Sequence, residues 1–395
     1  MTPKREIYEL TPLKVASVCV ILAAVIALLI VAKGLLIPFV IAVLVWYIIN
    51  TLADRLGEFR LIGRYLPNWA RLSLSALIIT FVLIVIGGLI AENAREMTTA
   101  IPRYQENIGQ LYVRIVEPPL EMVSARFGLA KGEVEARVGE YFSGPDSGAA
   151  LTAVLTGVIS TLSGFAANGF LIVIYVIFLL LEQSFFPKKV QALFPDSNRL
   201  SQFRDVMERI NESIHAYFTV KLSVSVLTAV ASYLIMLAVG LDFAIFWAFL
   251  IFLLNFIPNI GSLVATIFPA LVAVLQFDTL GPFFVILVGV GTVQVIVGNF
   301  IEPKMMGSQL NISSLVVIIA LTVWGVIWGV AGMILCVPIT VVMMIILAQF
   351  PNTRPIAILL SEKGELMHEL QEIHLSEHPE DFPAAEEPSP DESPA

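Results

Sequence analysis

The sequence predicts an all-α polytopic membrane protein with about eight transmembrane helices, of which some in the C-terminal half are broken or re-entrant. Three observations carry this prediction. Of the 395 residues, 57% are hydrophobic and only 14% are charged, whereas soluble domains are about 25% charged. The hydrophobic residues form long runs, and about 17–25 apolar residues in a row cross a bilayer as one helix. Prolines and glycines interrupt several runs, which predicts helices that break inside the membrane.

Residues 1–91 hold the N-terminal transmembrane helices. We expect spans over Leu13–Ala32, Leu35–Asn50 and Leu72–Ala91. The segment 51–71 carries four arginines and two acidic residues. Because basic loops stay on the cytoplasmic side, this segment and the N-terminus are expected in the cytoplasm.

Residues 92–150 are expected to form a helical segment outside the cytoplasm. Apolar side chains recur there with spacings of four and three, which is typical of one face of a helix. They are Met97, Ile101, Tyr104, Ile108, Leu111 and Ile115. This face either packs on its own chain or forms a seam between subunits, as a heptad spacing permits. A scaffold that assembles partners through this segment is thus a hypothesis from another functional class.

Residues 151–350 are expected to form the transmembrane transport region. It includes a cytoplasmic amphipathic helix at 185–214, which either lies under the membrane or forms a stalk on the next span. Two apolar halves, Phe243–Ile257 and Ser262–Gln276, are each short of a full span and predict a re-entrant or broken element. The run Ser313–Phe350 is too long for one span and must fold back or break. Residues 351–395 form an acidic cytoplasmic tail, disordered at its end.

The break between the two short halves is the strongest candidate for a substrate site. Pro258 removes a backbone donor and frees a carbonyl group one turn earlier, and Gly261 lets the backbone leave the helix. Ser262 is expected to cap the following half-helix, whose N-terminal end attracts polar oxygens. Secondary transporters bind substrates at such broken helices. Pro258, Asn259, Gly261 and Ser262 are therefore predicted to bind substrate, together with the neutral side chains of Gln294 and Asn299. An ordinary proline kink is the alternative.

Charged residues are rare in the C-terminal half. Between Leu222 and Phe350 only Asp242, Asp278, Glu302 and Lys304 are charged. Ionisable groups at membrane depth are costly and often mark a transport pathway. We predict that Glu302, Lys304 and Asp242 form a gate or couple transport to protons, while solvated positions at loops or at a membrane boundary are the alternative.

The glycines of the last apolar run fit a hinge or close helix packing. Gly325, Gly329, Gly332 and Pro338 interrupt this run, and we predict that they form a hinge. Small residues also let membrane helices approach each other closely, which is the alternative.

Enzymes and ATP-driven pumps are not predicted. The sequence holds no G-x-S-x-G, no H-E-x-x-H and no phosphate-binding loop, and no segment is long enough for a nucleotide domain. The net charge of −9 comes largely from the acidic tail and does not favour a nucleic-acid partner. We expect no cofactor and no metal. The expected partners are a small-molecule substrate and the lipid bilayer.

Three motifs, found in the same order, make the chain similar to the autoinducer-2 exporter family of bacterial and archaeal permeases. They are Phe256–Ser262, Gly298–Gly307 and Trp328–Pro338. The resemblance implies a multi-pass bacterial inner-membrane protein with cytoplasmic termini. It also implies a homo-oligomer, for which a pentamer is our working guess.

The resemblance also implies transport of small molecules without ATP. By family default the function is export of the quorum-sensing signal autoinducer-2, so a secondary transporter that exports a small polar metabolite is the predicted function. Some members are described as sodium/proton antiporters, and this activity is the alternative. Many members have a proline where Ser313 or Ser314 stands here.

Overall fold

A computed structural model describes residues 12–58, 66–111, 169–306 and 311–362, together with the single positions 157 and 364. Over these residues the regular structure is helical, apart from one isolated bridge between Ile312 and Ser361. The predicted all-α membrane class is therefore confirmed. The tail beyond 364 and most of the segment 112–168 lie outside the described residues, so the expectations for them stay predictions.

Five helices in the described part of the chain are long and apolar enough to cross a membrane. They are α2 (Lys33–Glu58), the first part of α3 (Asn68–Leu111), α9 (Ser197–Val239), the helix that runs from Gly281 to Met306, and α15 (Val330–Ala348). A sixth span results if α7 (Gly169–Glu182) and α8 (Phe186–Leu193), which are bent by 63°, are counted together. Shorter apolar helices are also present. They include α10 (Ala244–Leu254), α11 (Ile260–Gln276), α14 (Ser314–Trp328) and part of α1 (Pro12–Val31).

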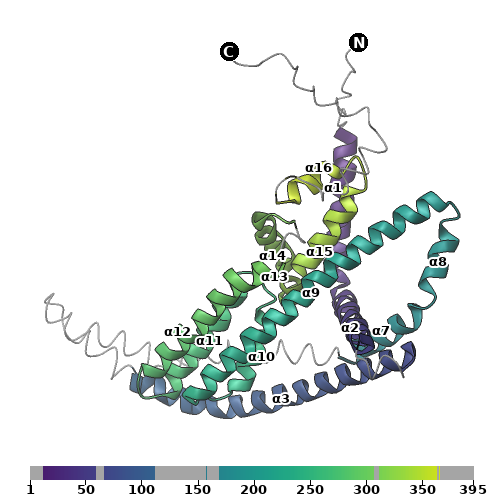
Figure 1. Cartoon of the computed structure of the whole chain (residues 1–395). Coiled ribbons are helices and arrows are strands. Elements are labelled where there is room, and N and C mark those ends of the chain that lie inside the picture. Colours follow the sequence, from purple (N-terminus) through teal and green to yellow (C-terminus); the bar gives the residue numbers. More distant parts are fainter. Residues whose placement is uncertain are drawn as a thin grey trace, which may run out of the picture.

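Two helices are longer than the sequence analysis expected. α3 has 44 residues and joins the expected third span to the segment after residue 92, while α9 has 43 residues. No proline lies at either junction, so helical hydrogen bonding continues through it. The polar start of α9 is therefore a stalk on the following span, which was one of the two alternatives. Figure 1 shows α9 crossing the molecule and α3 running along one end of it.

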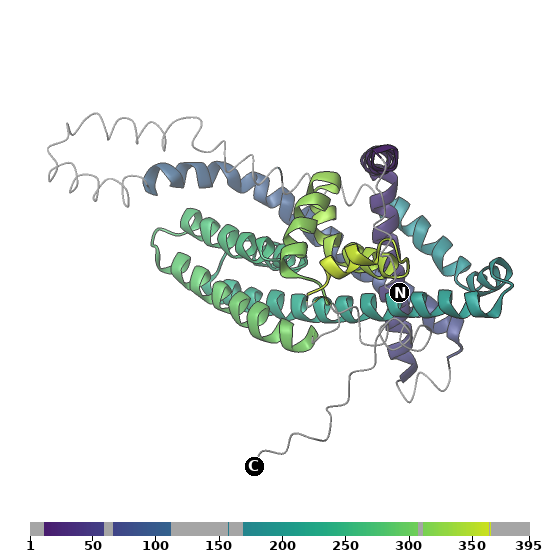
Figure 2. The ribbon, with the colours of Figure 1, turned by 90° about the horizontal axis from the view of Figure 1, so that it is seen from above.

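The first broken element is a re-entrant hairpin of α10 and α11. α9 ends at Gly240, which has a left-handed φ of 78°. α10 begins four residues later, and residues 255–259 connect it to α11. The Gln276 side chain at the end of α11 hydrogen-bonds to Gly240 O and to the backbone N–H of Asp242. These bonds hold the end of α11 beside the start of α10. Both ends of the hairpin therefore lie next to the C-terminal end of α9 (Figure 1 and Figure 2).

The second broken element is formed by α14 and α15, which pack on each other. Their connection is Gly329 alone, with φ 63° and ψ −141°. A side chain at Gly332 would collide with the backbone carbonyl of Trp324, so this glycine permits the close approach of the two helices. Pro338 lies buried inside α15. The long final run therefore folds back, which was one of the two alternatives, and the turn lies at Gly329.

Two hydrophobic clusters position the first hairpin. One joins α9 to α10, α11 and α12 (Gly281–Ile296) around Phe246 and Trp247, each 1% exposed. The other joins the middle of α9 to α14 and α15. Ile257, from the turn of the hairpin, belongs to this second cluster and is 5% exposed. The turn thus reaches from the first cluster to the second, and an open cavity lies beside it.

Candidate functional site

The candidate site is a cavity of about 1000 Å³ beside the turn of the α10–α11 hairpin. α9, α11, α12, α13 (Glu302–Met306), α14 and α15 contribute to its wall, together with the turn after α10 and the π turn after α12. Nine residues were predicted to bind the substrate, to gate transport or to couple it to protons, and six of them line the cavity. These are Pro258, Asn259, Ser262, Gln294, Asn299 and Glu302. The structure therefore brings the broken helix and the Asn299–Glu302 segment together, although they are about 40 residues apart in the sequence.

The wall formed by the hairpin turn is held in an unusual backbone conformation. Asn259 has φ 58° and ψ −54° and occupies the cap position before α11. Gly261 packs against the Leu254 carbonyl, and a side chain there would collide with it. The expected cap role of Ser262 is wrong, because its hydroxyl lies inside α11 and donates to Asn259 O at 2.9 Å. The positive end of the α11 dipole nevertheless lies at the cavity wall.

Glu302 reaches the cavity through a distortion of the α12 helix. Residues Val297–Ile301 form a π-helical turn, in which the N–H of Glu302 donates to Val297 O. Pro303 explains the distortion, since a proline has no N–H and clashes with the carbonyl group four residues earlier. One inserted residue rotates the following side chains by about 100° around the helix axis. The π turn is followed by the short helix α13 (Glu302–Met306), which begins at the carboxylate itself.

Glu302 forms an ion pair with Lys221 of α9. The Nζ atom of Lys221 lies 2.5 Å from Oε1 of Glu302, and the two side chains are only 6% and 20% exposed. Charge-assisted hydrogen bonds of this kind are short and strong. Separating the pair inside the protein would leave a buried charge unbalanced. The pair is therefore a strong connection between α9 and α13 at the cavity wall.

Two buried polar groups at the cavity have no hydrogen-bond partner among the described residues. They are the amide nitrogen of Gln294 on α12 and the hydroxyl of Tyr217 on α9. Gln294 is 7% exposed and Tyr217 is 2% exposed. Asn255, by contrast, donates to the Ser225 hydroxyl at 3.0 Å. Buried donors without partners are rare in proteins and call for an explanation.

Part of the cavity wall lies where the chain enters α14. Asn311, Ile312 and Glu362 form this part of the lining. Glu362 N–H donates to Asn311 O at 3.2 Å, and Ser313 N–H donates to Leu360 O at 3.1 Å. These bonds fasten the segment after α16 (Arg354–Leu360) beside the cavity lining.

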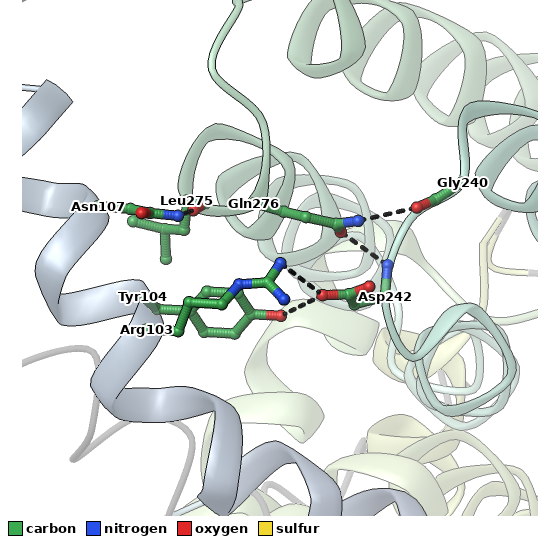
Figure 3. Close-up of polar contacts among 7 residues, drawn as sticks. All are labelled: Arg103, Tyr104, Asn107, Gly240, Asp242, Leu275 and Gln276. Carbon is green, nitrogen blue, oxygen red and sulfur yellow. Dashed lines mark hydrogen bonds and ion pairs between the residues drawn. The ribbon is translucent and has the colours of Figure 1, made fainter.

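Asp242 does not lie at the cavity. It belongs to a group that we call the α3 clamp, which fastens α3 to both ends of the hairpin (Figure 3). The clamp consists of Arg103, Tyr104, Asn107, Gly240, Asp242, Leu275 and Gln276. Oδ2 of Asp242 accepts from Arg103 at 3.3 Å and from the Tyr104 hydroxyl at 3.2 Å. Asn107 donates to Leu275 O at 2.6 Å.

The clamp also includes a buried tyrosine of the α3 helix. Tyr104 is fully buried within the first hydrophobic cluster. Burial raises the pKa of Tyr104 well above its usual range, and the Asp242 carboxylate raises it further. At this position the apolar face of α3 therefore packs on its own chain, which was one of the two alternatives.

The remaining predicted residues also lie away from the cavity wall. Lys304 is exposed. Gly325 packs against the Met333 side chain, Gly329 forms the α14–α15 turn, and Gly332 permits close packing. In the described residues no three His, Cys, Asp or Glu side chains are placed to hold a metal ion.

Lys221 and Tyr217 are the site residues that the sequence analysis missed. Both precede Leu222, the first residue of the segment in which charged residues were considered as candidates. Four residues separate them, so they lie on one face of α9. A lysine between Val220 and Leu222 was the available signal, because a charged residue at the start of an apolar span needs a partner.

Comparisons with known proteins agree with this architecture. Residues 19–352 match the family model of the AI-2E family transporters. The Escherichia coli AI-2 transport protein TqsA is 30% identical over 331 residues, which is 84% of this chain and 90% of TqsA. A Haemophilus influenzae protein with only a general transport name is 32% identical over 353 residues, 89% of this chain and 96% of that protein. The Escherichia coli protein YhhT, with a similarly general name, is 29% identical over 352 residues, 88% of this chain and 93% of YhhT. The chain therefore belongs to the AI-2E transporter family, a family of membrane transport proteins.

Proposed function

We propose that this protein is a secondary transporter that exports a small polar metabolite through the cavity, without ATP. The cavity carries the proposal. Helices apolar enough for a bilayer, such as α9 and α15, contribute to its wall, yet Asn259, Gln294 and Glu302 line it. Broken helices and polar groups are tolerated at membrane depth where they line a cavity. This arrangement favours a transport site over a simple proline kink.

The proposed substrate is autoinducer-2. This assignment rests on the name of TqsA, an AI-2 transport protein that is 30% identical to this chain. The cavity suits a small ligand with oxygen atoms, because the N-terminal end of α11 and several amide side chains line it. We place substrate contacts at Asn259, Ser262, Gln294 and Asn299.

We narrow the proposed gate to Glu302 with its partner Lys221. Lys304 and Asp242 do not line the cavity, so neither can contact a ligand there. Gly329 is the proposed hinge, since it alone connects α14 to α15 with a left-handed φ. Gly325, Gly332 and Pro338 then support the packing around this hinge.

The sodium/proton antiporter alternative gains no specific support. A sodium site needs a carboxylate that is available to the ion, and Glu302 is paired with Lys221. We further propose that the protein lies in the bacterial inner membrane with its termini in the cytoplasm. We also propose that the protein forms a homo-oligomer, for which a pentamer is the working guess.

Efflux from vesicles tests the proposed function. Purified protein is reconstituted into liposomes loaded with autoinducer-2, and release is followed with a reporter assay. We expect faster release than from empty liposomes, and a loss of that acceleration in Asn259→Ala and Glu302→Ala variants. Lys304→Ala is the matched control and should keep the acceleration. Equal release from protein-containing and empty liposomes would refute the autoinducer-2 assignment.

A further inference from the structure

The short helix α8 presents large apolar side chains to the outside of the molecule. Phe185, at the cap of α8, is 57% exposed, Phe186 is 49% exposed and Leu193 is 72% exposed. Among the described residues no other helix packs extensively on α8. Its end is held by Phe194, whose ring lies 5.1 Å from the ring of Phe203 on α9. α8 therefore connects α7 to α9 at the outer edge of the molecule, as both views show (Figure 1 and Figure 2).

The exposed side chains of α8 combine apolar and basic groups on one side of the helix. Phe185, Lys189 and Leu193 follow one another at intervals of four residues, and the Lys189 N–H donates to Phe185 O at 3.1 Å. Residues at this spacing lie on the same side of a helix. Phe186 lies beside Leu193, because seven residues make about two turns, and Lys188 borders the same side. We call these five residues the α8 face.

The α8 face continues an apolar stripe of α7. Exposed apolar side chains recur along α7 at spacings of three and four. They are Phe170, Val173, Ile177 and Leu181. α7 and α8 together are long and apolar enough for one broken membrane span, so we expect this stripe to face lipid. Phe185 comes four residues after Leu181, and the lipid-facing surface of α7 is therefore continuous with the α8 face.

Basic charge appears where the chain leaves this apolar run. Glu182 is the first charged residue after the run, and the helix axis bends by 63° between α7 and α8. Charged residues at the end of a span mark the level of the lipid headgroups. Lys188 and Lys189 follow, and both are exposed. Lys189 pairs with Glu182, whose side chain is 49% exposed, whereas Lys188 has no ion pair among the described residues. The α8 face therefore carries an excess of positive charge at headgroup level.

We infer that the α8 face binds the surface of anionic phospholipids. Phe185, Phe186 and Leu193 enter the boundary between headgroups and acyl chains, and the two lysines contact the phosphate groups. Aromatic rings beside lysines bind membrane surfaces in this way, and each lysine near an anionic surface adds to the attraction. Under the proposed orientation of the termini this surface is the cytoplasmic leaflet. Since α8 leads directly into the stalk of α9, the lipid contact fixes where that stalk begins.

Hydrogen–deuterium exchange of the full-length protein in lipid nanodiscs tests the inference. α8 has only eight residues, and so short a helix is marginal without further contacts. Binding to the bilayer should therefore slow its backbone exchange. We expect exchange in peptides that cover 185–194 to be about fivefold slower in discs with about 30% phosphatidylglycerol than in phosphatidylcholine discs. Salt at about 0.5 M should reduce this difference, because it screens exposed charges.

Variants of the α8 face separate the charged from the apolar contribution. Lys188→Gln/Lys189→Gln should remove the difference between the two lipids and keep exchange in phosphatidylcholine within about twofold. Phe185→Ser/Phe186→Ser should speed exchange in both lipids. Lys304→Gln, which removes an exposed lysine elsewhere, is the matched control and should keep the difference. Peptides from α11 should exchange alike in all variants, which verifies the fold. None of these readouts depends on the solute that the protein transports.

Four results would overturn the inference. Equal exchange of α8 in the two lipids would show that anionic headgroups are not recognised. A lipid difference that persists in Lys188→Gln/Lys189→Gln would remove the lysines from the contact. Equal slowing by soluble glycerophosphoglycerol in phosphatidylcholine discs would indicate a site for a free anion instead of a lipid surface. Slowing that increases with the concentration of the protein, and not with phosphatidylglycerol, would assign the α8 face to a second copy of the chain.

Discussion

Two acid–base pairs lie at opposite ends of the same group of helices, and their surroundings differ. Lys221 and Glu302 form a pair that is 6% and 20% exposed beside a cavity. Arg103 and Asp242 form a pair that is 59% and 32% exposed, within the α3 clamp. Lys221 lies 18 residues before the end of α9, so about 27 Å of helix separates it from the clamp. Asp242 and Glu302 were predicted to share one role, as a gate or in proton coupling, but their surroundings differ.

A carboxylate in a segment with few charged residues is therefore not necessarily a functional one. Asp242 takes part in several hydrogen bonds that fasten three helices, and solvent screens its ion pair. The Glu302 carboxylate accepts from a buried lysine, in a wall that also holds buried polar groups without partners among the described residues. We therefore expect the clamp to support the fold and the cavity pair to support transport.

Removing Lys221 should have the largest effect. A Lys221→Met substitution leaves Glu302 buried without its cation, which costs about 3–5 kcal/mol. We expect a large loss of Tm and no autoinducer-2 efflux, whereas Lys304→Met should change neither. The double variant Lys221→Met/Glu302→Met should recover most of the Tm without recovering efflux. Full efflux in the double variant would show that the pair is only structural.

Substitution of Gly261 tests the cavity wall itself. In Gly261→Ala the new methyl group meets the Leu254 carbonyl, and such overpacking costs about 1–3 kcal/mol. We expect a lower Tm and slower efflux. Gly34→Ala is the matched control, because no atom lies within 4 Å of its added Cβ. Equal Tm values for the two variants would argue against the close contact at the hairpin turn.

Asp242→Asn should have a smaller effect than either cavity variant. The lost ion pair is more than half exposed on its arginine side and contributes at most about 1 kcal/mol. We expect a Tm within a few degrees of the unaltered protein and efflux within about twofold. A loss of efflux with normal Tm would give Asp242 the gating role that its position does not support.

The smallest predicted effect is an alkaline loss of stability at the clamp. The pKa of Tyr104 is higher in the folded protein than its usual value of 10.0. Above pH 10 the unfolded chain therefore binds fewer protons at this residue than the folded chain, and stability falls as pH rises. Tyr104→Phe should reduce the decline in Tm between pH 10 and pH 11. An unchanged decline would show that the Tyr104 hydroxyl is not protected by the clamp.

Much of the fold could be predicted from the sequence because lipid imposes simple rules on it. The break around Pro258 and a bend among the glycines from Gly325 to Gly332 were predicted, since proline and glycine interrupt helices by local chemistry. The joining of segments into α3 and α9 was not predicted. A change from apolar to polar residues was interpreted as a helix end, although helical hydrogen bonding continues across it.

The cavity could be predicted only in part. Residues near the breaks, such as Asn259 and Asn299, were found because the local motif marks them. Lys221 and Tyr217 lie on an unbroken helix, and only the packing of α9 against α13 places them at the cavity. The π turn before Pro303 rotates Glu302, and a spacing argument that assumes a regular helix cannot include this rotation.

We propose that the buried pair at the cavity, and not the exposed pair of the clamp, supports transport. Autoinducer-2 efflux from liposomes with Glu302→Gln and with Asp242→Asn, compared at equal amounts of folded protein, tests it most directly. We predict a loss of about tenfold or more for Glu302→Gln and less than about twofold for Asp242→Asn. Equal losses in the two variants, or a larger loss for Asp242→Asn, would contradict the account.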